Sequence, residues 1–228
     1  MQYLAPTTAR MHRKEKNSVS TTRIVLIRHG ETRANREFRY IGARDDLLTE
    51  QGQAQAEKLA VALSEFSLAG IYSSPLQRAY HTALSIATRH NLAVQVVDDL
   101  REGDFGAWEG LSRAEVIARD GERLLAWERD TSIAPPGGES LEAMHRRVLA
   151  FIEKLAGTHP DQTVALVSHV GPIKAVLCAA LSAPVSSAFR IFLDPATISV
   201  VDWRQALPVV RLVNSHAHLG WQQARWMI

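Results

Sequence analysis

The sequence predicts an α/β fold, a three-layer α/β/α sandwich with a mostly parallel central sheet and a helical insertion. Short apolar runs alternate with segments whose apolar residues recur at helical spacing, the pattern of helices that connect parallel strands. The runs at residues 23–28 and 163–168 are continuous, which is typical of strands buried on both faces. These two observations carry the prediction.

The first elements follow in chain order. Residues 23–28 predict a strand that ends at the pair His29-Gly30. Thr49 starts a helical pattern, with one apolar face made by Ala56, Leu59, Ala60 and Leu63. Residues 70–73 are expected to form a short second strand.

The next helix has several start signals at once. Ser74 suits an N-cap, Pro75 suits the first helical position, and Gln77 completes a capping box. We therefore expect a helix from Ser74 to about His90, followed by a third strand at residues 93–97.

Residues 98–138 break this alternation. Ser112 and Glu115 form a second capping box that opens a short helix, and residues 135–138 read Pro-Pro-Gly-Gly. This segment is predicted to be an insertion that lies over the sheet and over its functional site.

The second half returns to alternating elements. A helical face consists of Leu141, Met144, Val148, Ile152 and Leu155. A buried strand is expected at 163–168, an apolar helix at 172–181, and late strands at 197–203 and 209–215, with a turn at Pro208.

Composition describes one domain in 228 residues. Apolar residues make up 46% and charged residues 22%, which excludes disordered and fibrous classes. The one cysteine, Cys178, is expected in the core and favours a cytoplasmic location. The longest apolar run, residues 175–181, is too short to span a membrane.

Charge separates the chain into two parts. The net charge is +2, but residues 1–23 carry +4, so the rest carries −2. Residues 1–22 are interpreted as a basic, flexible tail and residues 23–228 as the folded domain. Because the domain is mildly acidic, we expect neither nucleic acid nor a membrane as partner.

Two histidines each follow directly on a buried strand. In open α/β sheets, ligands bind beyond the carboxyl ends of the strands, so His29 and His169 are expected in one crevice. The glycines Gly30 and Gly171 beside them let backbone approach a ligand closely. A single histidine at a strand end is usually structural, whereas two at matching positions favour function.

Two arginines point to a phosphate ligand. Arg28 precedes His29, and Arg78 lies in the first turn of a predicted helix, where free N–H groups and the helix dipole attract anions. Each also has a structural interpretation, an ion pair for Arg28 and a solvated helix residue for Arg78. The sequence has neither an HExxH metal motif nor a P-loop, so nitrogen cations are expected to neutralise the phosphate, with no metal and no cofactor.

The string Arg28-His29-Gly30-Glu31-Thr32 resembles the signature of the histidine phosphatase superfamily, the phosphoglycerate mutase-like family. Residues 73–79, 100–110, 136–140 and 168–169 are similar to the family's other motifs, in the same order. The resemblance covers about residues 23–220.

The resemblance implies a role for each matching residue. His29 would be the nucleophile and Glu102 the proton donor to the leaving group. The catalytic set would also include Arg28, Arg78 and His169. The phosphate would be bound by Arg28, Asn35, Gly42, Arg78, His169 and Val170. Trp108 and Trp127 belong to the insertion and are candidates for contact with substrate.

The resemblance leaves the substrate open. We expect a metal-independent phosphomonoesterase acting on small phosphate esters, with a phosphoserine phosphatase, an α-ribazole phosphatase, a phosphoglycerate mutase and a non-catalytic phosphate-binding module as alternatives. The candidate specificity residues are Arg101, Phe105 and His218. Phosphoserine-selective relatives place a histidine where Phe105 stands, and His218 is considered as its partial substitute. A homodimer is the assembly considered.

Overall fold

A computed structural model describes residues 20–204 and 207–225 of the chain. Within these residues the strands are β1 Thr22–Arg28, β2 Gly70–Ser73, β3 Val94–Val96, β4 Thr163–Ser168, β5 Ile198–Trp203 and β6 Val209–Ser215. The helices are α1 Arg33–Arg36, α2 Glu50–Leu63, α3 Gln77–His90, α4 Arg113–Arg129, α5 Leu141–Thr158 and α6 Val170–Ala180.

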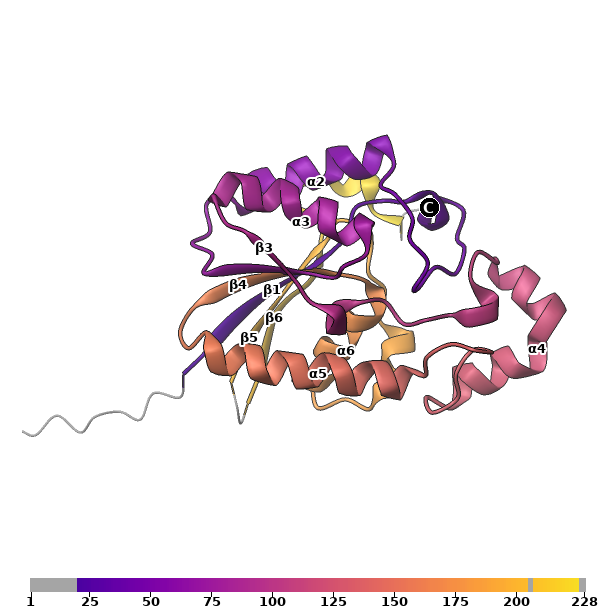
Figure 1. The fold of residues 1–228 in the computed structure, drawn as a ribbon. Coiled ribbons are helices and arrows are strands. Elements are labelled where there is room, and N and C mark those ends of the chain that lie inside the picture. The colour runs from indigo at the N-terminus through magenta and orange to yellow at the C-terminus, as the bar shows by residue number, and fades with distance from the viewer. Residues whose placement is uncertain (1–19, 205–206, 226–228) are drawn as a thin grey trace, which may run out of the picture.

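The strands form one sheet in the order β3-β2-β4-β1-β5-β6. Strands β3, β2, β4 and β1 pair in parallel, whereas β5 runs antiparallel to both of its neighbours. Helices α2 and α3 cover one face and α5 and α6 cover the other (Figure 1). The three-layer α/β sandwich with a mostly parallel sheet is confirmed.

The core has one layer on each face of the sheet. Ile24 and Leu26 of β1 pack toward α5 and α6, while the alternate residues Val25 and Ile27 pack toward α2 and α3. Because both faces are buried, the strand reads as a continuous apolar run. The central strands are thereby fixed in position, and so are the residues that follow them.

Residues 98–138 lie beyond the carboxyl ends of the strands, with α4 projecting to one side of the sandwich (Figure 1). A third apolar cluster forms here around Trp108, Val116 and Leu124. Trp108 is fully buried and its indole N–H donates to Asp120 at 2.9 Å, so it supports this segment from within.

Several predicted boundaries were wrong by one to three residues. Helix α3 begins at Gln77 rather than Ser74, and its N-cap, Leu76, makes no side-chain capping bond. Helix α6 begins at Val170, two residues before Pro172. Strand β1 already includes Thr22, which the predicted tail contained, and the tail's residues 1–19 lie outside the described part.

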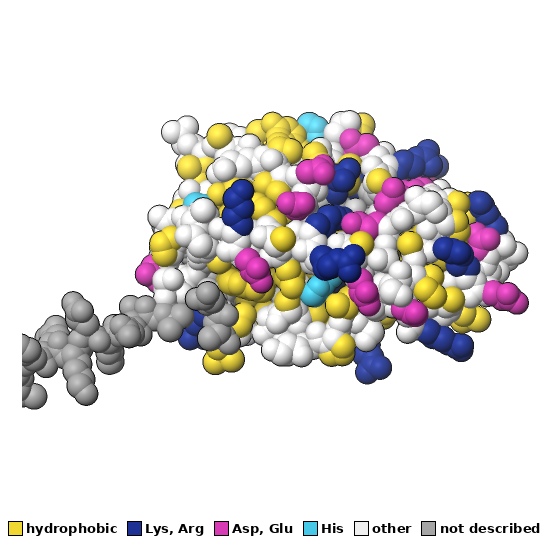
Figure 2. Space-filling model, turned by 60° about the horizontal axis from the view of Figure 1, so that its bottom comes forward, with side chains coloured by type: hydrophobic (Ala, Val, Ile, Leu, Met, Phe, Trp, Pro, Cys, Tyr) yellow, Lys and Arg dark blue, Asp and Glu magenta, His cyan; other side chains and the backbone are white. Residues whose placement is uncertain are grey.

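The surface shown in Figure 2 carries acidic and basic side chains close together, with apolar patches between them. None of the helices in the described ranges is both long and apolar enough to cross a membrane. The exclusion of nucleic acid stays a prediction.

Candidate active site

The register of β1 on β4 brings the two predicted histidines together. Arg28 pairs with Ser168 across the parallel strands, so the next residue of each strand emerges at the same edge of the sheet. The amide of His29 donates to the carbonyl of Ser168 at 3.0 Å, and the imidazole centroids of His29 and His169 lie 5.0 Å apart. Both imidazoles therefore lie in one place, as the sequence predicts.

The protonation state of His29 follows from its contacts. Its Nδ1 lies 2.7 Å from the carbonyl oxygen of Gly30, which can only accept, so Nδ1 carries the proton and Nε2 keeps a free lone pair. Burial, reinforced by the cations Arg78 and Arg28, holds the pKa of His29 well below its ordinary value. At neutral pH the ring is therefore neutral, and the lone pair on Nε2 can act as a base or as a nucleophile.

His169 is buried and neutral for the same reasons, with burial first and Arg78 second among the causes that hold its pKa well below the ordinary value. Arg78 Nε, which can only donate, lies 3.3 Å from His169 Nδ1. The ring proton is thus on Nε2, which donates to the Ser74 hydroxyl at 2.8 Å. Because both ring nitrogens bond to protein, a direct contact with phosphate requires one of these bonds to be exchanged.

The two arginines differ in how they are held. Arg78 is fully buried, and its terminal nitrogens donate to the carbonyls of Gly42 at 2.7 Å and Arg44 at 2.9 Å. Arg28 donates one terminal nitrogen to the carbonyl of Leu193 at 2.6 Å, but its buried Nε has no partner among the described residues. Burial lowers the pKa of Arg28 to about 10, so it stays cationic at neutral pH. Arg28 therefore has N–H capacity left for a ligand.

Asn35 and Val170 line the same cavity as Arg28 and His29. The side-chain oxygen of Asn35 accepts from the amide of Thr32 at 3.2 Å in a capping box, so its NH₂ group remains for a ligand. Val170 is the first residue of α6, where the backbone N–H has no partner within the helix. Both are placed to donate to an anion.

Gly42 is placed differently from the prediction. Its amide donates to both carboxylate oxygens of Glu109 at 3.0 Å, and its carbonyl accepts from Arg78. Both polar groups of Gly42 are thus used within the protein. In this structure Gly42 holds Arg78, and its contact with phosphate stays a prediction.

Glu102 lies against the N-terminus of α6. Its carboxylate accepts from the amide of Gly171 at 3.1 and 3.2 Å and from the amide of Gly103 at 2.9 Å. A Cβ on Gly171 would collide with the Glu102 carboxylate and the Met144 sulfur, so only glycine permits this approach. Glu102 is therefore held beside the start of the same helix that carries Val170.

Two adjoining cavities, each of about 150 Å³, meet at Glu102, Phe105 and Val170. We call the first the phosphate cavity; it is lined by Arg28, His29, Asn35, Arg39, Tyr40, Ile41, Glu102, Phe105 and Val170. Arg78 and His169 lie buried behind it. No three His, Cys, Asp or Glu side chains in the described part of the chain are grouped so as to hold a metal ion.

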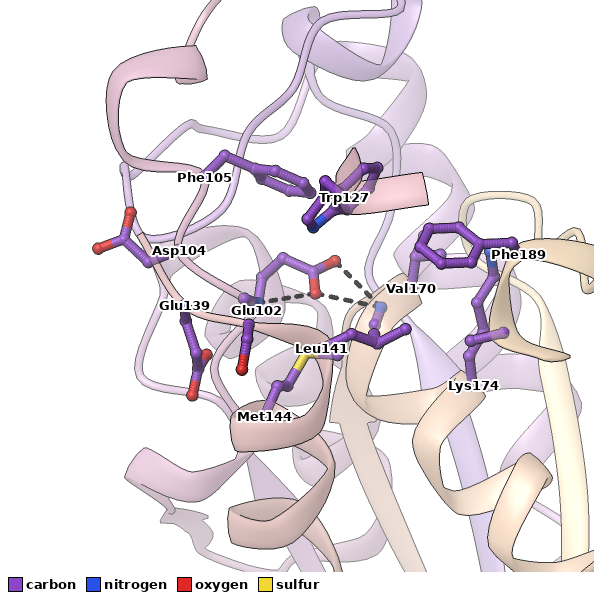
Figure 3. Close-up of a pocket in the computed structure, with 14 residues that line it drawn as sticks. Glu102, Asp104, Phe105, Trp127, Glu139, Leu141, Met144, Val170, Lys174 and Phe189 are labelled. Carbon is purple, nitrogen blue, oxygen red and sulfur yellow. Dashed lines mark hydrogen bonds between the residues drawn. The ribbon is translucent and has the colours of Figure 1, made fainter. Parts of the chain in front are cut away.

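We call the second the aromatic cavity, and Figure 3 shows it. Phe105 and Trp127 lie along one side above Glu102, and Phe189 and Lys174 lie across from them (Figure 3). The base is apolar, formed by Leu141, Met144 and Val170. Trp127 is thus placed to contact a bound molecule.

The three candidate specificity residues lie in different parts of the structure. Phe105 lines both cavities. Arg101 pairs with Asp98 at 3.0 Å and lines neither of these two cavities, although it lines a third one with Glu102 and Asp104. His218 also lines neither, because its Nε2 bonds to the carbonyl of Ala196 at 2.8 Å. The interpretation of His218 as a substitute at Phe105 is corrected by this placement.

Several lining residues carried no sequence signal. Lys174 and Phe189 lie 72 and 87 residues after Glu102, in segments that read as ordinary helix and loop. The local pattern marks Ser74 as a helix cap, whereas its hydroxyl bonds to His169 behind the cavity. Such residues can be identified only by their exposure to the crevice, and this exposure is known only from the folded structure.

Comparison with known proteins agrees with this geometry. The model of the histidine phosphatase superfamily, branch 1, matches residues 24–216. Bifunctional protein Rv2228c of Mycobacterium tuberculosis is 43% identical over 200 residues, which are 87% of this chain and 55% of that protein. The chain therefore spans about half the length of this relative.

Two further matches cover nearly the whole of the other protein. Phosphoserine phosphatase 1 of Hydrogenobacter thermophilus is 39% identical over 199 residues, which are 87% of this chain and 94% of that protein. The solved structure of a putative alpha-ribazole-5'-P phosphatase from Escherichia coli is 32% identical with a TM-score of 0.79, covering 86% of this chain and 97% of the other. The chain belongs to the histidine phosphatase superfamily.

Proposed function

We propose that this chain is a metal-independent phosphomonoesterase that hydrolyses small phosphate esters through a phosphohistidine at His29. The observation that carries the proposal is the state of His29: a buried, neutral imidazole with Nδ1 bonded to Gly30 and Nε2 free, next to the cation Arg28. This combination provides a nucleophile and positive charge at one point.

The reaction takes two steps. Nε2 of His29 attacks phosphorus in line, the P–O ester bond breaks, and the ester oxygen leaves with a proton from Glu102. Arg28, Arg78 and the N-terminus of α6 neutralise the phosphoryl oxygens. A water molecule then attacks the phosphohistidine, transfers its proton to the Glu102 carboxylate, and releases inorganic phosphate with His29 restored.

The position of Glu102 supports its role as acid. It lies where the phosphate cavity meets the aromatic cavity, so an ester oxygen that joins a phosphate in one to an alcohol in the other lies beside this carboxylate. The aromatic cavity would then hold the alcohol part of the substrate. Small phosphate esters are accordingly the proposed partners.

Phosphoserine hydrolysis is the specific alternative that one observation favours. The relative from Hydrogenobacter thermophilus, named phosphoserine phosphatase 1, matches along nearly its whole length. Against it, Phe105 lines the cavities and offers no group for the amino acid. We expect phosphoserine to be hydrolysed without selectivity over other carboxylate-bearing esters of similar size.

The test uses wild type and His29→Ala with p-nitrophenyl phosphate in the presence of EDTA. Wild type should release p-nitrophenolate, His29→Ala should lose several orders of magnitude, and an acid quench should trap an acid-labile phosphoprotein in wild type alone. A non-catalytic module would release nothing, and a metal-dependent phosphatase would lose activity in EDTA. A mutase would transfer phosphate between 3-phosphoglycerate and its isomer faster than it releases it.

A further inference from the structure

Lys174 is the one lysine among the residues that line the aromatic cavity. It lies on α6 one turn after Val170, and helical side chains lean toward the N-terminus of their helix. Its ammonium is thereby directed back toward the end of α6 where the phosphate cavity begins. Figure 3 shows the side chain running from α6 along the wall that Phe189 completes.

No hydrogen bond or ion pair to Lys174 occurs among the described residues, although three carboxylates line the same cavity. Each of these is bonded elsewhere. Glu139 forms a bidentate pair with Arg147, Glu102 accepts from the amides of Gly103 and Gly171, and Asp104 accepts from the amide of Gly106. The cation is left without a contact partner of opposite charge.

An isolated ammonium in apolar surroundings is unfavourable, and burial lowers the pKa of Lys174, with Glu102 acting in the opposite direction. The apolar groups that line the cavity give no acceptor, and among the described residues none of its three carboxylates lies within ion-pair distance of the ammonium. A bound anion would supply the missing partner, and the cavity volume of about 150 Å³ is of the size that holds one six-membered ring.

We propose that Lys174 makes this enzyme selective for phosphomonoesters whose alcohol part is a flat apolar group bearing a carboxylate. The apolar group would lie between Phe105, Trp127 and Phe189, and the carboxylate would pair with the Lys174 ammonium. The inference rests on the proposed phosphatase function, because it places the phosphate at His29.

The experiment compares three aryl phosphates of similar size that carry an anionic, a neutral and a cationic substituent: 4-(carboxymethyl)phenyl, 4-ethylphenyl and 4-(2-aminoethyl)phenyl phosphate. At least one methylene group separates each charged group from the ring, so the three phenols have similar leaving-group acidity. Wild type should have a kcat/KM at least tenfold higher for the carboxylate than for the neutral ester, and lowest for the ammonium ester.

Variants then locate the selectivity. Lys174→Met should reduce the ratio of kcat/KM for the carboxylate over the neutral ester to about one, and Lys174→Arg should preserve most of it. Lys154→Met, on the exposed face of α5, is the matched control and should keep the wild-type ratio. A ratio that is unchanged in Lys174→Met, or close to one in wild type, overturns the inference.

Binding measurements test this inference independently of the proposed function. If none of the esters is hydrolysed, the proposed function fails. The corresponding benzylic phosphonates, which cannot be hydrolysed, would still report on Lys174 by calorimetry. A preference for the carboxylate phosphonate that Lys174→Met removes supports the inference, and equal affinities for the three phosphonates overturn it.

Discussion

Replacing Arg147 should test how Glu102 is positioned, independently of the attack of His29 on phosphorus. Its guanidinium forms a bidentate pair with Glu139, at 2.8 and 2.7 Å, and is only 18% exposed. It also donates to three carbonyls of the loop that carries the acid, those of Asp99 at 2.7 Å, Arg101 at 2.9 Å and Glu102 at 3.3 Å. One side chain thus holds the backbone of Glu102 to α5.

Arg147→Met would remove all five of these bonds and leave the Glu139 carboxylate partly buried without its cation. Breaking one partner of a fully buried pair costs about 3–5 kcal/mol, and the partial exposure here reduces the expected loss of stability to about 2–3 kcal/mol. A loosened Glu102 should protonate the leaving group less well. We therefore expect kcat/KM for an alkyl phosphate to fall about tenfold to a hundredfold, and that for p-nitrophenyl phosphate several-fold less, because nitrophenolate leaves with little help.

The control is Arg146→Met, because Arg146 is the neighbouring arginine on α5 and is exposed. It should change neither urea unfolding nor the ratio between the two substrates. Equal losses on both substrates in Arg147→Met would refute the reasoning, since they would mean that Arg147 supports the fold without positioning the acid. Arg147→Lys should recover little, because an ammonium cannot reproduce the bidentate geometry.

Three further predictions address the acid and the histidines. Glu102→Gln should slow hydrolysis of alkyl phosphates far more than of p-nitrophenyl phosphate, and an equal loss would show that Glu102 positions groups rather than transferring a proton. Gly171→Ala should displace the acid and lower kcat/KM for alkyl phosphates at least tenfold, whereas Gly157→Ala, where a Cβ meets open space, should leave it unchanged. His29 and His169 have depressed pKa values in the folded state, so the unfolded chain binds more protons below about pH 6.5. The free energy of unfolding should therefore fall as pH drops from 6.5, by up to about 1.4 kcal/mol per pH unit for each histidine, and a pH-independent urea midpoint between pH 7.5 and 5.5 would contradict this.

The sequence predicted the sheet and its catalytic edge well, for a physical reason. Strands buried on both faces are continuous apolar runs, and their ends are marked where polar residues begin. His29 and His169 both occupy such an end, and parallel pairing of β1 with β4 places them side by side. Their proximity thus depends on the fold class, which the alternation of elements already indicates.

The local signals for a helix start gave a wrong prediction where tertiary contacts use the same polar groups. Ser74, Pro75 and Gln77 satisfy the rules for a helix start, but the helix begins at Gln77. The amide of Gln77, which a Ser74 capping box would hold, donates instead to the Asp45 carboxylate at 2.9 Å. The Ser74 hydroxyl accepts from the amide of Leu76 at 3.3 Å and from His169, a residue 95 positions away, and only the folded chain brings these partners together.

The two cavities are built from different elements of the fold. Because of this difference, the substrate can change while the reaction at phosphorus is unchanged. Arg28 ends β1 and His29 follows it, where sheet hydrogen bonds fix the backbone, and Arg78 lies buried in the first turn of α3. The aromatic cavity is instead completed by side chains from α4, α6 and the 3₁₀ segment Val185–Arg190. Trp127 and Phe189 contact each other edge to face, with ring centroids 5.1 Å apart, outside the central sheet. Substitutions at these walls would alter the space for the alcohol without moving His29, so selectivity is expected to vary independently of the phosphoryl chemistry.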